Sequence, residues 1–118
     1  MTEEQRERLT EGGLDVSRGM ERFLQKDEMY FRFLKRFLED KSYEELEAAM
    51  KSKDYQKAFG HAHTLKGLLA NLAITGPMEA LQPLTEKLRY EEKEGLEEMM
   101  EEFVRRFQRA WQAIESLE

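Results

Sequence analysis

One short segment combines a histidine, a lysine and a glycine at the spacing of neighbouring helical turns. Lys66 and Gly67 follow His63 by three and four positions, which places all three on one side of a helix. A neutral imidazole is a nucleophile near neutral pH, because free imidazole titrates at about pH 6.5. Its ring nitrogen can accept a phosphoryl group, whose charge a lysine one turn away can neutralise. The glycine leaves room for a second protein to reach the histidine.

A helix from about residue 54 to about residue 73 carries this segment. At about 100° per residue, five apolar residues gather on one side and define the face toward the core: Ala58, Ala62, Leu65, Leu69 and Leu72. His63 lies about 140° from the middle of that group and is predicted to face solvent. Phe59 and Ala70 lie around it, and Lys66 is the only charge there. We therefore expect a smooth docking surface for a partner protein.

Two further residues of this helix help to assign the role of His63. Gly67 in a helix interior costs about 1 kcal/mol relative to alanine. Its outward position favours the close approach of a partner over helix packing. His61 lies about 60° from the centre of the core face, so we expect it at the boundary of the core without a catalytic role.

The remaining segments are predicted to form helices, and these must position the helix that carries His63. The N-terminal half shows the following boundary signals: a capping box of Thr2 with Gln5, an end at Gly12-Gly13, a cap at Asp15, a longer helix starting at Asp27, and a capping box of Ser42 with Glu45. The arm that starts at Asp27 is expected either to continue past Lys41 or to kink there.

Three breaks divide the C-terminal half. Thr75-Gly76-Pro77 should start a new helix, with Pro77 at its first position. Pro83 should kink that helix, and the last helix should begin after Gly95. Short connections between amphipathic helices favour an all-α fold, an antiparallel up-down-up-down four-helix bundle with short extra N-terminal helices. Residues 1–118 are expected to form a single domain.

Composition excludes several classes of function. The 118 residues are 37% charged with a net charge of −6, which argues against nucleic acid as a partner. No cysteine is present, so disulfides and thiolate metal sites are excluded. The charged N-terminus does not resemble a signal peptide, and no segment has the roughly 20 apolar residues of a membrane span. We expect a cytoplasmic protein that does not associate with membranes. It has no glycine-rich phosphate loop for ATP.

His63-Thr64-Leu65-Lys66-Gly67, followed by Ala70-Asn71-Leu72, resembles the signature of histidine-containing phosphotransfer (HPt) domains. The upstream and downstream helices resemble that family as well, so the similarity covers nearly the whole chain. The resemblance implies an antiparallel four-helix bundle with the histidine exposed in the middle of a helix. It also implies the middle carrier of a His–Asp phosphorelay, with His63 phosphorylated and Lys66 and Gly67 next to the phosphate.

The sequence departs from the family pattern at two positions. Ala73 stands where the family usually has glycine, which affects how the helix ends. Many members have a glutamine on the next helix that bonds the active imidazole. That position falls at or near Thr85, and Gln82 one turn away could take its place.

The resemblance also implies partners. They would be response-regulator receiver domains and a hybrid or sensor histidine kinase. The chain itself would be a monomeric phosphocarrier, without autonomous enzyme activity, cofactor or metal. Mg²⁺ would be supplied by the receiver, because few carboxylates surround His63.

Three other interpretations remain open at this stage. The chain could be the phosphoacceptor domain of a chemotaxis-type or hybrid sensor kinase, whose histidine an ATP-bound kinase domain would phosphorylate. It could be a helical adaptor that docks receivers without accepting phosphate. A ferritin-type metal protein is disfavoured, because that class needs inward Glu-x-x-His pairs and neither His61 nor His63 is preceded by one.

Overall fold

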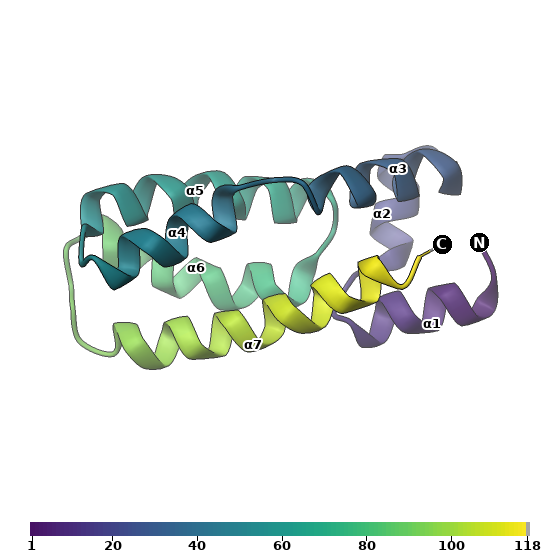
Figure 1. Cartoon of the computed structure of the whole chain (residues 1–118). Coiled ribbons are helices and arrows are strands. Elements are labelled where there is room, and N and C mark those ends of the chain that lie inside the picture. Colours follow the sequence, from purple (N-terminus) through teal and green to yellow (C-terminus); the bar gives the residue numbers. More distant parts are fainter. Residues whose placement is uncertain (118) are drawn as a thin grey trace.

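A computed structural model describes residues 1–117, and it contains seven helices and no strand in that range. They are α1 (Glu3–Glu11), α2 (Val16–Arg22), α3 (Asp27–Phe37), α4 (Ser42–Lys51), α5 (Tyr55–Asn71), α6 (Thr75–Arg89) and α7 (Leu96–Glu115). Helices α4 to α7 pack in sequence order and run in alternating directions, and α1 to α3 gather at one end (Figure 1). The molecule measures 43 × 20 × 20 Å. The all-α prediction is confirmed.

Local signals set the N-terminal boundaries as predicted. The Thr2 hydroxyl accepts from the Gln5 backbone N–H at 3.0 Å, and the Gln5 side chain accepts from the Thr2 N–H at 2.8 Å. The Asp15 carboxylate caps α2 through the Arg18 N–H at 3.1 Å. Gly13 has a φ of 97°, which glycine adopts without steric cost. This turn joins α1 to α2.

The predicted capping box of Ser42 with Glu45 is wrong. Ser42 is the first residue of α4, and no side chain caps the helix from the N-cap position at Lys41. The Asp40 carboxylate takes that role from one residue earlier and accepts from the Ser42 N–H at 2.8 Å. Residues 38–41 separate α3 from α4, so of the two alternatives left open by the sequence the chain breaks near Lys41 and does not continue as one helix.

Pro77, one of the two prolines of α6, sits differently from the prediction. The helix begins at Thr75, so Pro77 is its third residue instead of its first. The missing N–H of Pro77 still falls within the first turn, where backbone donors have no acceptor inside the helix. Pro83 lies within α6, which runs from Thr75 to Arg89, and the kink expected at this residue stays a prediction.

The connection between α5 and α6 is fastened to the N-terminal helices. Ala73 has a φ of 58°, a left-handed conformation that costs an alanine about 1–2 kcal/mol. Its carbonyl accepts from the Asp15 N–H at 2.8 Å. Beside it, the buried Tyr30 hydroxyl donates to the Leu72 carbonyl at 2.8 Å. The C-terminal end of α5 is thereby held against α2 and α3.

No helix within residues 1–117 has both the length and the apolar character needed to cross a bilayer.

Candidate functional site

Helix α5 presents His63 to solvent because its opposite face is fixed in the core. The Asp54 carboxylate caps the helix by accepting from the Lys57 N–H at 3.2 Å. Four apolar residues of α5 are completely buried: Ala58, Ala62, Leu65 and Leu69. Their burial sets the rotation of the helix, and His63 is exposed. The predicted orientation of the imidazole is confirmed.

An aromatic side chain one turn earlier lies against His63. The rings of Phe59 and His63 are stacked, with centroids 6.0 Å apart and planes inclined by 30°. Phe59 is half-buried against the edge of the core. From α6, the Arg89 guanidinium lies 5.1 Å from the centroid of the Phe59 ring. Arg89 also pairs with Glu86 at 3.4 Å. The surface beside His63 thus includes an aromatic ring and a second cation.

Lys66 and the glycines of α5 leave the surface around His63 uncrowded. Lys66 is half-buried and forms no ion pair with any residue in the range 1–117. A Cβ placed on Gly67 would meet no atom within 4 Å, so internal packing does not explain this glycine. The same holds for Gly60, one turn before His63. Sequence reasoning overlooked Gly60, although its spacing of three residues from His63 was visible.

Gln82 and Thr85, the two residues considered for orienting the imidazole, have different environments. Thr85 is completely buried, and its hydroxyl donates to the Leu81 carbonyl of its own helix at 2.8 Å, a bond typical of threonine within helices. Gln82 is exposed. Among residues 1–117, neither residue forms a hydrogen bond with His63. The orienting role of Gln82 or Thr85 stays a prediction, and the side chain stacked on the imidazole is Phe59.

His61 lies at the boundary of the core, as predicted. Its side chain is 32% exposed, and its Nδ1 lies 3.1 Å from an Oε atom of Glu45 on α4. This contact joins α4 to α5. Ala70, expected on the docking surface, is half-buried.

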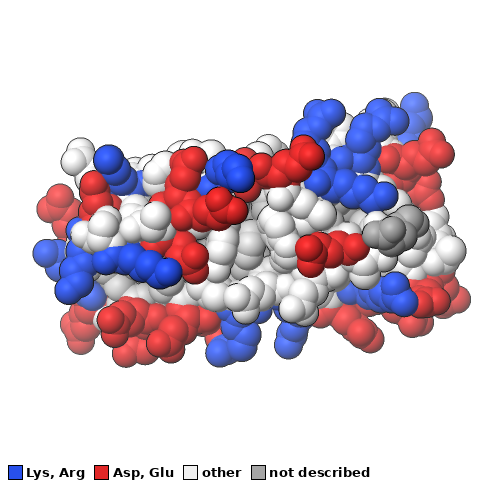
Figure 2. All heavy atoms as spheres, viewed as in Figure 1, with Lys and Arg blue, Asp and Glu red and all other residues white. Residues whose placement is uncertain are grey.

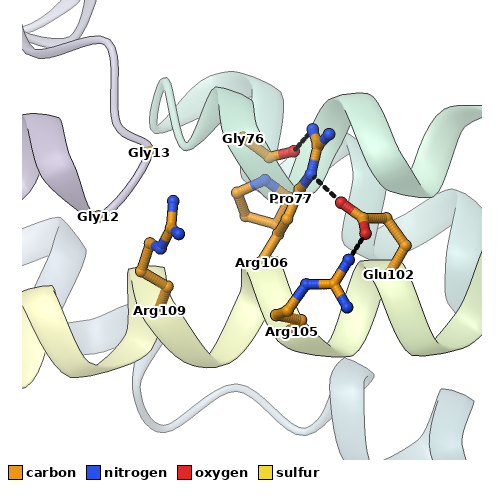
Figure 3. A pocket seen from close by; sticks show the side chains of 8 residues that line it. All are labelled: Gly12, Gly13, Gly76, Pro77, Glu102, Arg105, Arg106 and Arg109. Carbon is orange, nitrogen blue, oxygen red and sulfur yellow. Dashed lines mark hydrogen bonds and ion pairs between the residues drawn. The ribbon is translucent and has the colours of Figure 1, made fainter.

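Away from His63, a polar cleft lies between the α1–α2 turn, the start of α6 and α7 (Figure 3). Its volume is about 300 Å³, and Arg105, Arg106 and Arg109 line it. Arg106 donates to the Gly76 carbonyl at 3.2 Å and to Glu102 at 2.6 Å, and Glu102 also pairs with Arg105. The bond from Arg106 to Gly76 braces α7 against α6, whereas both contacts of Glu102 lie within α7. Within residues 1–117, no three His, Asp or Glu side chains gather closely enough to share a metal ion.

The arrangement on α5 can therefore do one kind of chemistry well. An accessible imidazole can act as a nucleophile toward a group brought by another molecule. Lys66 supplies positive charge one turn away. Gly60 and Gly67 place no side chain on the neighbouring turns. A reacting centre on a second protein can thus come close to the ring.

Comparison with known proteins agrees with this geometry. The sequence model of the Hpt domain family matches residues 28–117. All of the residues around His63 described above lie in the matched segment, whereas α1 and α2 lie before it. No curated protein sequence and no solved structure matches the chain significantly.

Proposed function

The chain belongs to the Hpt domain family, and we propose on this basis that His63 carries a phosphoryl group between receiver-domain aspartates in a two-component phosphorelay. Hpt domains are phosphocarrier modules that interact with receiver domains and histidine kinases. The observation that carries the proposal is the exposed His63 imidazole on a helix face whose neighbouring turns are occupied by glycine. Because Gly60 and Gly67 have no side chains, nothing at these two positions blocks a partner that approaches the ring.

The transfer proceeds by nucleophilic attack of a neutral ring nitrogen of His63 on the phosphorus of an aspartyl phosphate. The N–P bond forms as the P–O bond to the aspartate breaks, and the aspartate leaves as a carboxylate. Such a loose, in-line transfer depends on positioning and charge neutralisation more than on covalent assistance. The Lys66 ammonium is suited to bind the transferred oxygens. Transfer to a second receiver reverses these bond changes.

The partners divide the chemistry between them. We propose that Mg²⁺ is supplied by the acidic pocket of the receiver. The chain has no Gly-x-x-x-x-Gly-Lys-Ser/Thr sequence, and we propose that it receives phosphate from a partner and does not use ATP by itself.

The decisive experiment uses an isolated receiver domain that has been phosphorylated with radiolabelled acetyl phosphate. Incubation should transfer the label to this chain as an acid-labile, base-stable adduct. The His63→Gln variant should take up no label, whereas the matched control His61→Gln should keep most of it. Label on His61, or no label with any receiver tested, would refute the assignment.

The same preparation separates the other two roles considered for this domain. A phosphoacceptor domain of a kinase would be labelled by an ATP-bound kinase domain and only slowly by a phosphorylated receiver. A docking adaptor would bind receivers equally well as His63→Gln and would never be labelled. Rapid labelling from the receiver supports the carrier.

A further inference from the structure

The turn between α2 and α3 exposes an apolar side chain in an unfavourable backbone conformation. Leu24 and Gln25 have φ values of 55° and 62°, in the left-handed region that costs a residue with a side chain about 1–2 kcal/mol. The Leu24 side chain is 76% exposed, more than any other large apolar side chain in residues 1–117. Folding alone therefore gives no reason for leucine at this position.

Two aromatic rings connect this turn to the core. The Phe23 ring stacks on Tyr30, and its centroid lies 5.2 Å from that of Phe33. Tyr30 is completely buried and donates to the Leu72 carbonyl, whereas Phe33 is 37% exposed. Phe23, Leu24 and Phe33 thus form an apolar strip that the core anchors and whose outer edge meets solvent.

Unpaired cations border this apolar strip. The Arg36 guanidinium lies 5.2 Å from the centroid of the Phe33 ring, and Arg22 and Lys26 flank the turn in sequence. All three cations are exposed, and none of them forms an ion pair within residues 1–117. The strip and its cations together are called the α2–α3 patch: Arg22, Phe23, Leu24, Lys26, Phe33 and Arg36.

The acidic side chains of this region lie away from the strip. At about 100° per residue, Glu21 lies about 160° from Phe23, the C-cap of α2. By the same measure, Glu28 lies about 140° from Phe33 around α3. Asp27 pairs with the N-terminal ammonium group. The charge that borders the strip is therefore positive.

This end of the molecule differs in charge from the rest. Residues 18–36 hold six of the nineteen Lys and Arg residues but only three of the twenty-five Asp and Glu residues. Figure 2 shows Lys and Arg side chains gathered over α3, with acidic side chains at their margin. The Hpt family model matches from residue 28 onward, so the part of the patch on α2 and the turn lies outside the family match.

The α2–α3 patch is also separate from the phosphoacceptor. Tyr30 ties the patch to Leu72, which follows His63 by nine residues, or about 14 Å along a helix. The ring stacked on His63 belongs to Phe59, which is not part of the patch. A short segment bound to the patch can therefore leave the imidazole open to a receiver.

We propose that the α2–α3 patch binds an acidic amphipathic segment of a partner protein. Carboxylates of that segment pair with Arg22, Lys26 and Arg36, and its apolar side chains lie against Leu24 and Phe33. Arginine and aromatic residues are enriched at protein interfaces, and a guanidinium stacked on a ring keeps N–H groups free for a carboxylate. The excess of acidic residues in the remaining chain opposes an anionic membrane as the occupant.

A fluorescein-labelled synthetic peptide of glutamate, alanine and leucine tests the proposal, with its leucines spaced to form one face of a helix. Fluorescence anisotropy with the full chain should show binding that weakens about tenfold between about 50 and 500 mM salt. A peptide of the same composition with scrambled leucines should bind about fivefold more weakly. Its apolar side chains no longer meet Leu24 and Phe33 together.

Two charge reversals of equal size test the cations. Arg22→Glu with Arg36→Glu should weaken peptide binding at least about tenfold, because both charges that face the carboxylates are reversed. The matched control is Lys51→Glu with Lys53→Glu, on two exposed lysines at the C-terminal end of α4. It changes the net charge equally and should bind within about twofold of the unchanged chain.

Leu24→Asn separates binding from folding. Asparagine tolerates a left-handed φ better than leucine does, so unfolding should need an equal or higher urea concentration. The affinity for the helical peptide should nevertheless fall about fivefold, because the exposed apolar contact is lost. A residue with a purely structural role would not show this combination.

Four results would overturn the proposal: no binding of the helical peptide, equal binding of the scrambled peptide, equal binding by the two charge-reversed variants, or unchanged affinity in Leu24→Asn. Binding of phosphatidylserine vesicles in place of the peptide, lost in Arg22→Glu with Arg36→Glu, would assign the patch to a lipid surface instead. None of these measurements involves phosphoryl transfer, so the partner site and the phosphocarrier function can fail separately.

Discussion

The ring of Phe59 lies stacked beside the imidazole of His63, with their centroids 6.0 Å apart. Because Phe59 is half-buried against the core, it is held more firmly than an exposed side chain would be. We expect the ring to limit the directions in which the imidazole can turn, and so to align it for the proposed transfer before a partner arrives. Preorganisation of this kind lowers the entropy lost on reaching the reactive geometry.

Replacing Phe59 with leucine should slow phosphoryl transfer several-fold. The substitution keeps an apolar group at the edge of the core but removes the flat ring that borders His63. We expect the free energy of unfolding to fall by about 1 kcal/mol. Rapid-quench measurement of label transfer from a phosphorylated receiver gives the rate. A rate equal to that of the unchanged chain would show that the stacking has no part in transfer.

Lys66→Ala should reduce the transfer rate by about 10- to 100-fold, as expected when a charge-assisted contact worth about 1–3 kcal/mol is lost. Lys66 forms no ion pair in the described chain, so its removal should leave urea unfolding nearly unchanged. Lys57→Ala is the matched control, because Lys57 is an exposed lysine on the same helix nearly two turns before His63. Equal rates for the two variants would remove Lys66 from the mechanism.

Gly60→Ala should stabilise the chain and slow transfer at the same time. An alanine Cβ at this position meets no atom within 4 Å, and the better helix propensity adds about 1 kcal/mol. The added methyl group lies on the face that a receiver approaches, so transfer should slow. Gly67→Ala should behave in the same way.

Gly19→Ala provides the contrast, because its new Cβ would collide with the Tyr30 ring and should destabilise the fold by about 1–3 kcal/mol. Urea unfolding measures the stability of each glycine variant, and label transfer from a phosphorylated receiver measures its transfer rate. Faster or unchanged transfer in Gly60→Ala would mean that receivers do not contact this turn.

Tyr30→Phe should destabilise the chain by about 1–3 kcal/mol without blocking transfer. The Tyr30 hydroxyl donates to the Leu72 carbonyl at 2.8 Å in a buried position, and its loss leaves that carbonyl without its partner. Tyr90→Phe, on a residue that is 67% exposed, should change stability by less than about 0.5 kcal/mol. If Tyr30→Phe and Tyr90→Phe unfold at the same urea concentration, the hydrogen bond from Tyr30 to Leu72 does not stabilise the fold as expected.

The free energy of unfolding should fall in alkaline solution, where Tyr30 and Tyr43, whose pKa values are raised in the folded chain, lose their protons. Burial, together with the nearby Glu47 carboxylate, raises the pKa of Tyr43 to about 12, whereas an unfolded tyrosine has a pKa of about 10. The folded state therefore keeps the proton that the unfolded state loses. This contribution is fully present below about pH 10 and is lost as the pH rises through about 12.

The variant Tyr43→Phe should lose less stability over that interval. Some pH dependence should remain, because burial and the charge of Asp15 also raise the pKa of Tyr30. Denaturant unfolding at a series of pH values gives the slope of the free energy of unfolding against pH for each variant. Identical slopes for Tyr43→Phe and the unchanged chain would contradict a contribution of Tyr43 to this pH dependence.

The spacing of apolar residues in α5 was enough to predict which face of the helix carries His63. The burial of Ala58, Ala62, Leu65 and Leu69 depends on the helical repeat, which is a local property. The positions of these four residues therefore fixed the outward direction of His63 before any packing was known. Helix caps at Thr2 and Asp15 could be predicted as well, because a cap and its backbone partner lie within three residues.

Which side chains from other helices lie near that face depends on how the helices pack. Arg89 reaches Phe59 from the next helix, while Thr85 is turned to Leu81; spacing along the chain does not give such distances. Asp40 replaced Ser42 in stabilising α4 because the turn after α3 brought its carboxylate to the Ser42 N–H. The stacking of Tyr43 on Phe107 has the same origin, because α4 and α7 are more than forty residues apart in sequence and only the packing of the bundle brings these rings together.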